Sequence, residues 1–513
     1  MLSSDTLQAT PGRFNEADAA RRGCVRVVIL RGSAHAMHPS AEGADFELMV
    51  AAGAVDGRPE VTPAAGGVPR VLWIAHAFPC QPGNASAMNS AKRQRIRRHQ
   101  VPGAVLPMSE PFPAVVVTGL GAVTPVGSTA GETWDALLAG RSGIVPLDEE
   151  WSAGLPVRIA GRVTADVPSL LSTLEYKRMD RCGHLALIAA REAWSHAGRP
   201  GTDPERLAVV IGSGYGGLDT TLEQTRTLDV KGPRRVSPHT LTRIMVNGPA
   251  AWVSIDLGAR GGARTPVSAC ASGAEAISQA ADMIRSGAAD VVIAGGVDSC
   301  INGLTISGFS QIRALSTRND SPQAASRPFD RDRDGFVMAE GAGIVVLERE
   351  DHARARGAEV LGVIAGSAVT SDAVDIVAAD PAMQRRVLQK AMAAAGLTGE
   401  DIGFVHAHAT STPVGDRLEA EAIGAVVGHS VPVTSTKSLT GHLLGGAGAL
   451  GAIVTIQALR TGAIPGTLNL DNTDPDIHLN IVSETTRGLA AKAGISNAFG
   501  FGGHSASLVI TAG

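Results

Sequence analysis

Cys270 is the residue of this chain with the clearest potential for covalent chemistry. It ends a strand-like run (residues 265–270) and opens a segment whose apolar residues recur at helical spacing from Ala276 to Ile284. A thiol at the N-terminus of a helix has its pKa lowered by the helix dipole, which favours the nucleophilic thiolate. Gly273 and the flanking small residues leave room for a substrate carbonyl. Taken alone, Cys270 fits a nucleophile, but it also fits an inert thiol packed as a small apolar side chain.

Three histidines and a lysine lie at two turns of the second half of the chain. His406 and His408 end one strand-like run, and Lys437 precedes His442 by five residues after the next run. A cysteine with two histidines suits acyl transfer to the thiol followed by a reaction at a second carbonyl group. The thiolate attacks, and the imidazoles donate hydrogen bonds to a developing oxyanion or enolate. The His-x-His spacing also suggests a metal site, but no cysteine or acidic cluster completes a ligand set, so we expect no metal.

Two further motifs match binding-site patterns only in part. Residues 212–217 (GSGYGG) satisfy the GxGxxG pattern of dinucleotide sites, but the polar stretch 218–227 does not clearly continue as a helix. We therefore predict a tight glycine turn at a strand end. Residues 330–335 (DRDRDG) resemble the start of a calcium loop, but Gly341 occupies the twelfth position, where a bidentate acid is needed. We predict a charge-laced turn that orders a loop.

The elements that must position these residues alternate between short Val/Ile-rich runs and Ala/Leu-rich amphipathic stretches, which is typical of an α/β protein. Residues 192–212 and 390–407 each read as a helix, an Ala-Gly stop, an acidic residue and a strand. Residues 265–288 and 431–463 each read as a strand, a small-residue helix and a matching stop. An internal duplication explains both pairs, and we expect the turns of two such halves to converge on one site.

The amino-acid composition and net charge exclude several classes of protein. The chain has 513 residues, of which 44% are hydrophobic and only 3% aromatic, which indicates a closely packed core of small aliphatic side chains such as buried parallel sheets provide. A net charge of -4 gives no basic field for nucleic acid. Five widely spaced cysteines without a CxxC pair favour reduced thiols and a cytoplasmic location. The uncharged run 438–459 predicts a buried core helix and no membrane span.

The first 107 residues differ from the rest. They are rich in Ala, Gly, Pro and Arg, show little periodicity and contain the basic run 92–98 (KRQRIRR). We interpret residues 1–107 as a disordered leader or an over-long start, with Met108 as a possible biological start. A regulatory arm or a nucleic-acid patch is the alternative. The predicted globular part comprises an N-terminal half, residues 108–360, with the nucleophilic cysteine and a C-terminal half, residues 361–513, with the two histidines.

At these residues the chain resembles the β-ketoacyl-[acyl-carrier-protein] synthases, in particular the type II elongating condensing enzymes, from Val115 to the C-terminus. The nucleophile motif is matched by residues 268–273 (SACASG). The two histidine motifs are matched by 407–413 (AHATSTP) and 437–442 (KSLTGH), and the C-terminal glycine loop by 499–503 (FGFGG). Residues 155–159 and 245–248 are also similar to the meromycolate-extending synthases of mycobacteria.

The resemblance implies an α/β, thiolase-like fold of five layers, αβαβα, built from two duplicated halves. It implies an acyltransferase of fatty-acid elongation that works as a homodimer, without cofactor or metal. The expected reaction is a decarboxylative Claisen condensation of a cysteine-bound acyl chain with malonyl-acyl carrier protein, giving 3-oxoacyl-acyl carrier protein. The partners would be acyl- and malonyl-loaded acyl carrier protein. A ketosynthase of a type II polyketide or other specialised lipid pathway is the alternative.

The resemblance also implies roles for single residues. Cys270 would receive the acyl chain, His408 and His442 would assist decarboxylation, and Lys437 would set the electrostatics of the site. The oxyanion hole would consist of the N–H groups of Cys270 and Phe501, with Phe501 gating access. The remaining implied residues are Glu419, Phe499 and Gly502 as supports and Met245 in the wall of the acyl pocket.

Three positions depart from the pattern of that family. His406 stands where Asn is common, Ala339 replaces a usual Gly, and residues 372–375 (DAVD) differ from the usual Asp-Ala-x-His near the substrate entrance. We therefore expect altered packing beside His408 and altered contacts to the malonyl or pantetheine group. Acyl chain length does not follow from these residues.

Overall fold

The computed structural model describes residues 113–513 in full and, before them, the backbone of three short strands. These strands, β1 (Val25–Arg31), β2 (Glu47–Val50) and β3 (Trp73–Ala77), pair antiparallel in the order β2-β1-β3. They belong to a unit of their own, residues 1–104. Most of the predicted leader, including its basic run, lies outside the described residues, so its interpretation stays a prediction.

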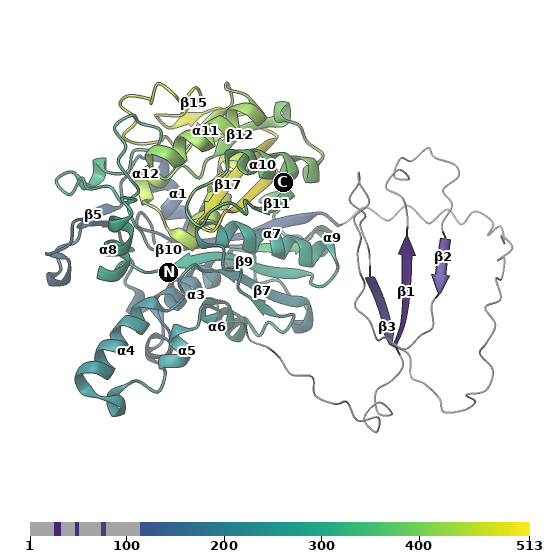
Figure 1. Cartoon of the computed structure of the whole chain (residues 1–513), viewed down its shortest axis with the longest axis horizontal. Helices are drawn as coiled ribbons and strands as arrows, with labels where there is room; N and C mark the ends of the chain where they lie inside the picture. Colours follow the sequence, from purple (N-terminus) through teal and green to yellow (C-terminus); the bar gives the residue numbers. More distant parts are fainter. Residues whose placement is uncertain (1–24, 32–46, 51–72, 78–112) are drawn as a thin grey trace, which may run out of the picture. The chain divides into compact units, whose positions relative to one another are not determined.

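Eleven strands of the main unit form one hydrogen-bonded series (Figure 1). In spatial order they are β15 (Asn480–Ile481), β13 (Pro432–Thr434), β12 (Ile402–His406), β17 (Ala493–Gly500), β18 (His504–Thr511), β11 (Gly362–Ser371), β4 (Val115–Val123), β10 (Gly341–Arg349), β9 (Val291–Asp298), β7 (Leu207–Gly212) and β8 (Ala263–Arg264). Two further pairs are short and antiparallel: β5 (Ile144–Pro146) with β6 (Ile159–Gly161), and β14 (Ala463–Ile464) with β16 (Thr486–Arg487).

The series divides into two sets of strands with the same internal order. The first set begins with the antiparallel neighbours β4, β10 and β9 and continues with the parallel strands β7 and β8. The second set begins with the antiparallel neighbours β11, β18 and β17 and continues with the parallel strands β12 and β13. The two sets meet through only two residue pairs, Gly362 with Val117 and Val363 with Val116. Each set is therefore a mixed sheet of its own, and the arrangement agrees with the predicted duplication. The boundaries 108–360 and 361–513 stay predictions.

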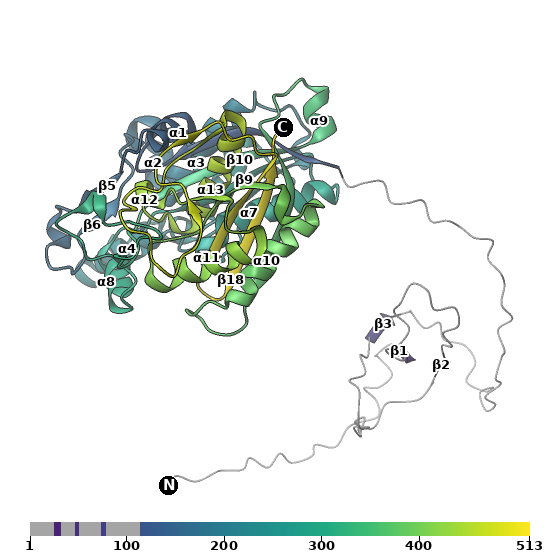
Figure 2. The ribbon, with the colours of Figure 1, turned by 90° about the horizontal axis from the view of Figure 1, so that it is seen from above.

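Helices cover both sheets and fill the space between them. Helix α3 (Arg181–His196) packs on β4 and β10, and α10 (Pro381–Ala395) packs on β11 and β18 (Figure 2). The small-residue helices α7 (Ser272–Arg285) and α13 (Ala447–Thr461) contact strands of both sets and each other. The layers therefore run helix, sheet, helix, sheet, helix, and the predicted five-layered αβαβα architecture is confirmed.

The central helices approach each other closely because glycines face each other across the contact. A Cβ added to Gly273 of α7 would lie 2.7 Å from the carbonyl oxygen of Gly445, and one added to Gly448 of α13 would lie 2.7 Å from the backbone nitrogen of Ala274. The remaining helices are α1 (Ala130–Leu138), α2 (Thr173–Arg178), α4 (Leu218–Lys231), α5 (Thr240–Ile244), α6 (Gly248–Leu257), α8 (Gly303–Gln311), α9 (Glu350–Ala355), α11 (Pro413–Val427) and α12 (Lys437–Thr440).

One local expectation was wrong. The glycine-rich run after β7 forms a turn as predicted, but the polar stretch behind it is helical and forms most of α4. Threonine hydroxyls of this helix donate to carbonyl oxygens one turn earlier, from Thr221 to Gly217 and from Thr225 to Thr221. These local bonds satisfy the hydroxyl groups without breaking the helix, and α4 also packs against α5.

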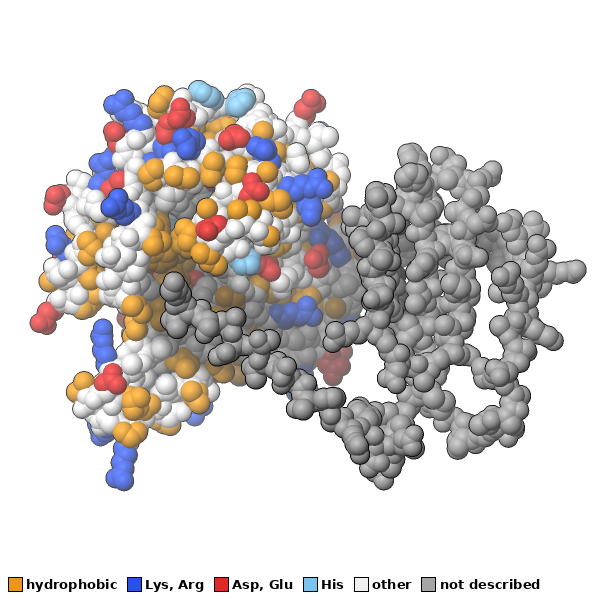
Figure 3. Space-filling model, viewed as in Figure 1, with side chains coloured by type: hydrophobic (Ala, Val, Ile, Leu, Met, Phe, Trp, Pro, Cys, Tyr) orange, Lys and Arg blue, Asp and Glu red, His pale blue; other side chains and the backbone are white. Residues whose placement is uncertain are grey.

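The uncharged run 438–459 forms α12 and most of α13. The side chains of α13 are buried from Ala447 to Ile456, so the predicted core helix is confirmed. Among the residues that the structure describes, no helix combines the length and apolar character that crossing a bilayer requires. Acidic, basic and apolar side chains are interspersed over the visible face of the main unit (Figure 3).

Candidate active site

Cys270 lies in a strained turn directly before α7. The turn is a single 3-10 segment, residues 269–271, and α7 begins at Ser272. Ala269 has a φ of 50°, a left-handed conformation that a non-glycine residue adopts only when its surroundings enforce it. The hydroxyl of Ser272 accepts a hydrogen bond from Ser268 N at 3.0 Å and donates one to Ala269 O at 2.7 Å. These bonds fix the turn, and Cys270 remains partly exposed at its tip.

The end of β17 approaches the Cys270 turn so closely that only glycine fits there. A Cβ at Gly500 would lie 2.4 Å from Ser268 O and 3.1 Å from Cys270 N. Neither the N–H of Cys270 nor that of Phe501 donates a hydrogen bond to another residue in the described part of the chain. Both amides are therefore available to a ligand beside the thiol.

The pKa of the Cys270 thiol differs from our expectation. Burial and the negative charge of Asp298 raise it to about 12, and the positive charge of Lys437 opposes them. The predicted lowering by the helix N-terminus is outweighed, because removing a thiolate from water disfavours its charge more than the dipole of one helix favours it. The resting side chain is a protonated thiol.

His408 follows β12 and is held through its backbone by a buried carboxylate. Glu419 of α11 accepts hydrogen bonds from His408 N at 2.8 Å and from Ala409 N at 2.6 Å. The Glu419 carboxylate also accepts one from Asn497 Nδ2 at 3.1 Å, and Asn497 in turn accepts one from Ser507 Oγ. The predicted supporting role of Glu419 thus has a geometric basis, namely two adjacent amides of the His408 turn.

His442 is fixed by backbone hydrogen bonds to the segment before β10. Its N donates to Val337 O at 2.8 Å, and its O accepts from Ala339 N at 2.9 Å. The side chain is only 2% exposed, and neither ring nitrogen has a partner in the described part of the chain. The Phe336 ring contacts the His442 ring edge to face at a centroid distance of 5.4 Å. The imidazole is therefore oriented by packing, with its nitrogens free.

The two imidazoles face each other. The His408 and His442 rings are 5.3 Å apart between centroids with an interplanar angle of 83°, and the Phe499 ring packs on His408 at 5.7 Å. Burial and the charge of Lys437 lower the pKa of both histidines well below the usual value of 6.5. Both are neutral at pH 7, and a neutral imidazole can donate one N–H to a carbonyl oxygen.

Lys437 supplies the positive charge of this group. Its side chain is 4% exposed at the start of α12, and burial lowers its pKa to about 8. Burial raises the pKa of Glu419 to about 7, and the hydrogen bonds from His408 and Ala409 oppose this shift. The positive charge of Lys437 also acts on Cys270, which links the nucleophile turn of the first half to the histidine turns of the second.

Three other predicted site residues lie in turns or at helix ends outside the group of Lys437, His408 and His442. Phe501 is 40% exposed on the turn between β17 and β18, and its ring centroid is 6.3 Å from that of Phe309 of α8. Gly502 has a φ of 89°, which favours glycine, and its N–H donates to Ile376 O at 2.7 Å. Met245 is 41% exposed at the end of α5, and its place in an acyl pocket stays a prediction.

His406 is a buried structural residue in this arrangement. Its Nε2 lies 2.9 Å from Thr436 Oγ1, in the turn before Lys437, and burial lowers its pKa to about 3. The side chain lies against the backbone of Gly451, where an added Cβ would be 2.9 Å from Nδ1. His406 therefore fills space between β12, α12 and α13 and does not join the pair of free imidazoles.

The charge-laced turn at residues 330–335 orders a loop, as predicted. Asp330 accepts hydrogen bonds from Arg327 and from two backbone amides, and Arg333 donates to Asp474 and to two carbonyl oxygens of the His408 turn. These side chains are occupied by protein groups. No group of three or more potential metal ligands occurs among the residues that the structure describes.

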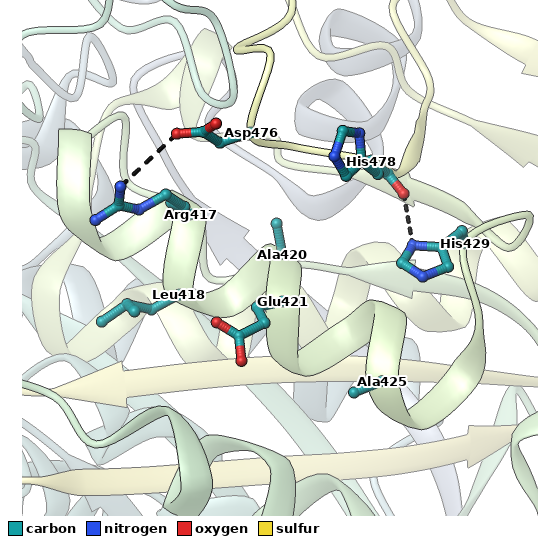
Figure 4. Close-up of a pocket in the computed structure, with 8 residues that line it drawn as sticks. All are labelled: Arg417, Leu418, Ala420, Glu421, Ala425, His429, Asp476 and His478. Carbon is teal, nitrogen blue, oxygen red and sulfur yellow. Dashed lines mark hydrogen bonds and ion pairs between the residues drawn. The ribbon is translucent and has the colours of Figure 1, made fainter.

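A groove lies elsewhere, on the outer face of α11 (Figure 4). It has a volume of about 570 Å³, and it contains the ion pair of Arg417 with Asp476 at 3.8 Å and the hydrogen bond of His429 with His478 O at 2.7 Å. None of the predicted site residues lines this groove, so it is separate from the Cys270 group.

One residue of the site was missed from the sequence. Asp298, the last residue of β9, is completely buried and is the second cause, after burial, of the raised pKa of Cys270. Its signal was a lone acidic residue at the end of the otherwise apolar run 291–297.

Comparison with known families gives two matches that together cover most of the main unit. The model of the "Beta-ketoacyl synthase, N-terminal domain" matches residues 113–353, and that of the "Beta-ketoacyl synthase, C-terminal domain" matches residues 361–471.

Individual relatives agree with these matches. The chain is 43% identical over 403 residues to 3-oxoacyl-[acyl-carrier-protein] synthase 2 of Mycobacterium bovis, which covers 77% of this chain and 97% of that protein. It is 41% identical over 402 residues to the protein of the same name from Synechocystis, with 77% and 97% coverage.

Solved structures are similar in the same region. A β-ketoacyl synthase from Burkholderia phymatum has a TM-score of 0.74 and 33% identity, covering 78% of this chain and all of that one. The ketosynthase of a type II polyketide synthase, solved with its acyl-carrier protein and bound to a hexaketide, has a TM-score of 0.72 and 29% identity, with 79% and 100% coverage.

Proposed function

The chain belongs to the β-ketoacyl synthase family, and we propose that it is an acyltransferase that elongates acyl chains on acyl carrier protein. The reaction is the decarboxylative Claisen condensation of a Cys270-bound acyl chain with malonyl-acyl carrier protein. The observation that carries the proposal is the pair of neutral imidazoles of His408 and His442, which the charge of Lys437 links to a thiol in a strained turn. This donor set suits two carbonyl reactions at one place.

The first step is acyl transfer. Cys270 Sγ attacks the thioester carbonyl of acyl-acyl carrier protein, and the carrier's thiol leaves with the proton that the cysteine gives up. The tetrahedral oxyanion is stabilised by the amides of Cys270 and Phe501, which have no other acceptor among the described residues. Since the resting thiol is protonated, its proton moves as the bond forms.

The second step joins two carbons to the chain. Malonyl-acyl carrier protein loses carbon dioxide, and the N–H groups of His408 and His442 stabilise the enolate that remains. The enolate carbon attacks the Cys270 thioester, the Cys270 thiolate leaves, and 3-oxoacyl-acyl carrier protein is formed. The positive charge of Lys437 stabilises the departing thiolate, which then takes up a proton.

A second candidate is a ketosynthase of a type II polyketide or other specialised lipid pathway. It is favoured by the likeness to the polyketide ketosynthase and by the departure of residues 372–375 from the pattern of the elongating enzymes. The chemistry at Cys270 is the same in both, and the accepted acyl chain distinguishes them.

The proposal includes a homodimer and a cytoplasmic location. Strand β8 ends the described strand series, and exposed apolar side chains lie beside it, Ile255 of α6 at 71% and Val267 at 54%. An open sheet edge flanked by apolar side chains suits a second copy of the chain. Free thiols at the three described cysteines, Cys182, Cys270 and Cys300, fit a reducing compartment.

The test is intact-protein mass spectrometry after addition of acyl-acyl carrier protein and then malonyl-acyl carrier protein. We expect a mass gain equal to the acyl group, its absence in Cys270→Ala, and release of a 3-oxoacyl product on the second addition. Comparing long-chain acyl carriers with short polyketide-type carriers separates the two candidates. Acylation by coenzyme A esters alone, or no acylation, would contradict the proposal.

A further inference from the structure

Asp298 is a buried carboxylate that the proposed reaction does not use. It lies at the end of β9 with no exposed surface. Its Oδ1 accepts hydrogen bonds from Ser213 Oγ at 2.8 Å, from Gly214 N at 3.1 Å and from Tyr215 N at 3.1 Å. Its Oδ2 accepts from Gly214 N at 3.0 Å and from Gly445 N at 2.7 Å.

Every group that binds Asp298 is a hydrogen-bond donor. Three of them are backbone amides, and the fourth is the Ser213 hydroxyl, which accepts from Gly216 N at 3.0 Å and so directs its proton toward the carboxylate. Four donors therefore stabilise the carboxylate form of Asp298, while burial raises the pKa of this group.

The donors come from two turns that flank the Cys270 site. Ser213, Gly214 and Tyr215 belong to the turn after β7 in the first half. Gly445 follows His442 by three residues in the second half. The fit is close, because a Cβ at Gly445 would lie 2.7 Å from Asp298 Oδ2. The carboxylate thus joins a turn of one half to the His442 turn of the other.

The turn after β7 also touches the nucleophile turn. A Cβ at Gly214 would lie 3.7 Å from Ala269 Cα, and one at Gly212 would lie 2.3 Å from Ser272 O. A displacement of the 213–215 turn therefore reaches Ala269, directly before Cys270, and the adjoining end of β7 reaches Ser272. Without the carboxylate, the amides of Gly214, Tyr215 and Gly445 would lose their acceptor, and that of Gly445 is buried.

We propose that Asp298 is a positioning residue for the condensation: its carboxylate binds one turn from each half and so fixes the spacing of the Cys270 and His442 turns. The inference rests on the proposed function, in which Cys270 is the nucleophile. It accounts for a buried carboxylate that is bound by four donors from two turns.

The charged groups that act on Cys270 come from two elements. Lys437 of α12 favours the thiolate, and Asp298 of β9 disfavours it. Tyr215 and Cys300 also lie within the field of Asp298, and burial raises the pKa of each, so both remain neutral. Changing Asp298 therefore changes one of the two fixed charges near the thiol.

The experiment compares three variants of the full chain. Asp298→Asn removes the charge and part of the hydrogen bonding. Ser213→Ala removes one donor and keeps the charge. Asp219→Asn is the matched control: this nearby carboxylate binds Asn302 at 2.8 Å and acts on Cys300, and it makes none of the turn contacts. For each variant we measure the rate constant of Cys270 alkylation by iodoacetamide at pH 8–9, kcat of condensation and the melting temperature.

For Asp298→Asn we expect two opposite effects. The alkylation rate constant rises by about threefold, because a pKa lowered by about one unit gives tenfold more thiolate of lower intrinsic nucleophilicity. Meanwhile kcat falls by about tenfold to a hundredfold, because the turns lose a charged acceptor. Ser213→Ala lowers kcat by a smaller factor without raising alkylation, and Asp219→Asn changes neither.

The results that overturn the inference are equally specific. If kcat of Asp298→Asn stays within twofold of the wild type, Asp298 does not position the turns. If its alkylation rate is unchanged, or rises equally in Ser213→Ala, the Asp298 carboxylate does not act on the Cys270 turn. Should Asp298→Asn fail to fold, an unchanged kcat in Ser213→Ala overturns the inference. Acylation of wild-type Cys270 tests the proposed function separately.

Discussion

Replacing Gly500 by alanine tests whether the geometry of the Cys270 turn limits the reaction. The added Cβ would lie 2.4 Å from Ser268 O, whereas ordinary contact begins at 3.4 Å, so the two segments must separate by about 1 Å. The φ of Gly500 is not in the left-handed region, so the effect is steric and not conformational. A displacement of about 1 Å of a reacting group lowers a rate by about a hundredfold, or about 2.7 kcal/mol in activation free energy.

The assay measures kcat of condensation with acyl- and malonyl-acyl carrier protein, together with the melting temperature. Gly308→Ala is the control, because a Cβ at this exposed position of α8 meets no atom within 4 Å. We expect full activity there and a gain in stability of about 0.5–1 kcal/mol. A folded Gly500→Ala protein with kcat within threefold of the wild type would refute the argument that β17 fixes the nucleophile turn.

Three further predictions concern the charge of the site and the assembly of the chain. Burial lowers the pKa of Lys437 to about 8, so kcat should fall as the pH rises through 8, because the lysine then loses the charge that stabilises the departing thiolate. The pH profile of Lys437→Met should lack this alkaline limb. A limb with the same midpoint in the variant would contradict the assignment to Lys437. The pKa of His408 and His442 lies well below 6.5, so neither histidine should contribute an acid limb between pH 6.5 and 8. Ile255→Glu should convert a dimer into a monomer in light scattering, since a charge at an apolar interface is disfavoured; a wild-type protein of monomer mass would contradict the proposed homodimer.

The sequence predicted those site residues that belong to short local motifs. Cys270, His408 and His442 each stand in a short turn among small residues. The structure brings the two imidazoles together and places Lys437, at the start of α12, where its charge acts on all three. The repeated order of helix, stop, acid and strand likewise indicated the duplication, because each unit of that order folds locally. The roles of these residues in catalysis stay predictions until activity is measured.

The sequence was uninformative where the effect depends on burial or on distant partners. A helix N-terminus after Cys270 predicted a lowered pKa, but the extent of burial and the position of Asp298 are tertiary properties. Asp298 is 28 residues from Cys270 in sequence, and its partners lie as far away as Gly445. The helix α4 was missed for a related reason, since its threonines are stabilised by bonds that composition does not reveal.

The duplication also explains why Asp298 has a partner at Gly445. Helices α7 and α13 each follow a three-residue 3-10 turn, residues 269–271 and 444–446, and the first residue of each turn has a φ of 50°. Cys270 and Gly445 are the middle residues of these turns. In one copy the middle amide is left without an acceptor among the described residues, beside the thiol; in the other it donates to Asp298 at 2.7 Å. The turn 269–271 thus leaves its middle amide free within the described part of the chain, whereas the turn 444–446 joins the two halves through Asp298. In the proposed reaction the Cys270 amide binds the oxyanion, so the contact of Gly445 with Asp298 helps to fix the geometry that this step needs.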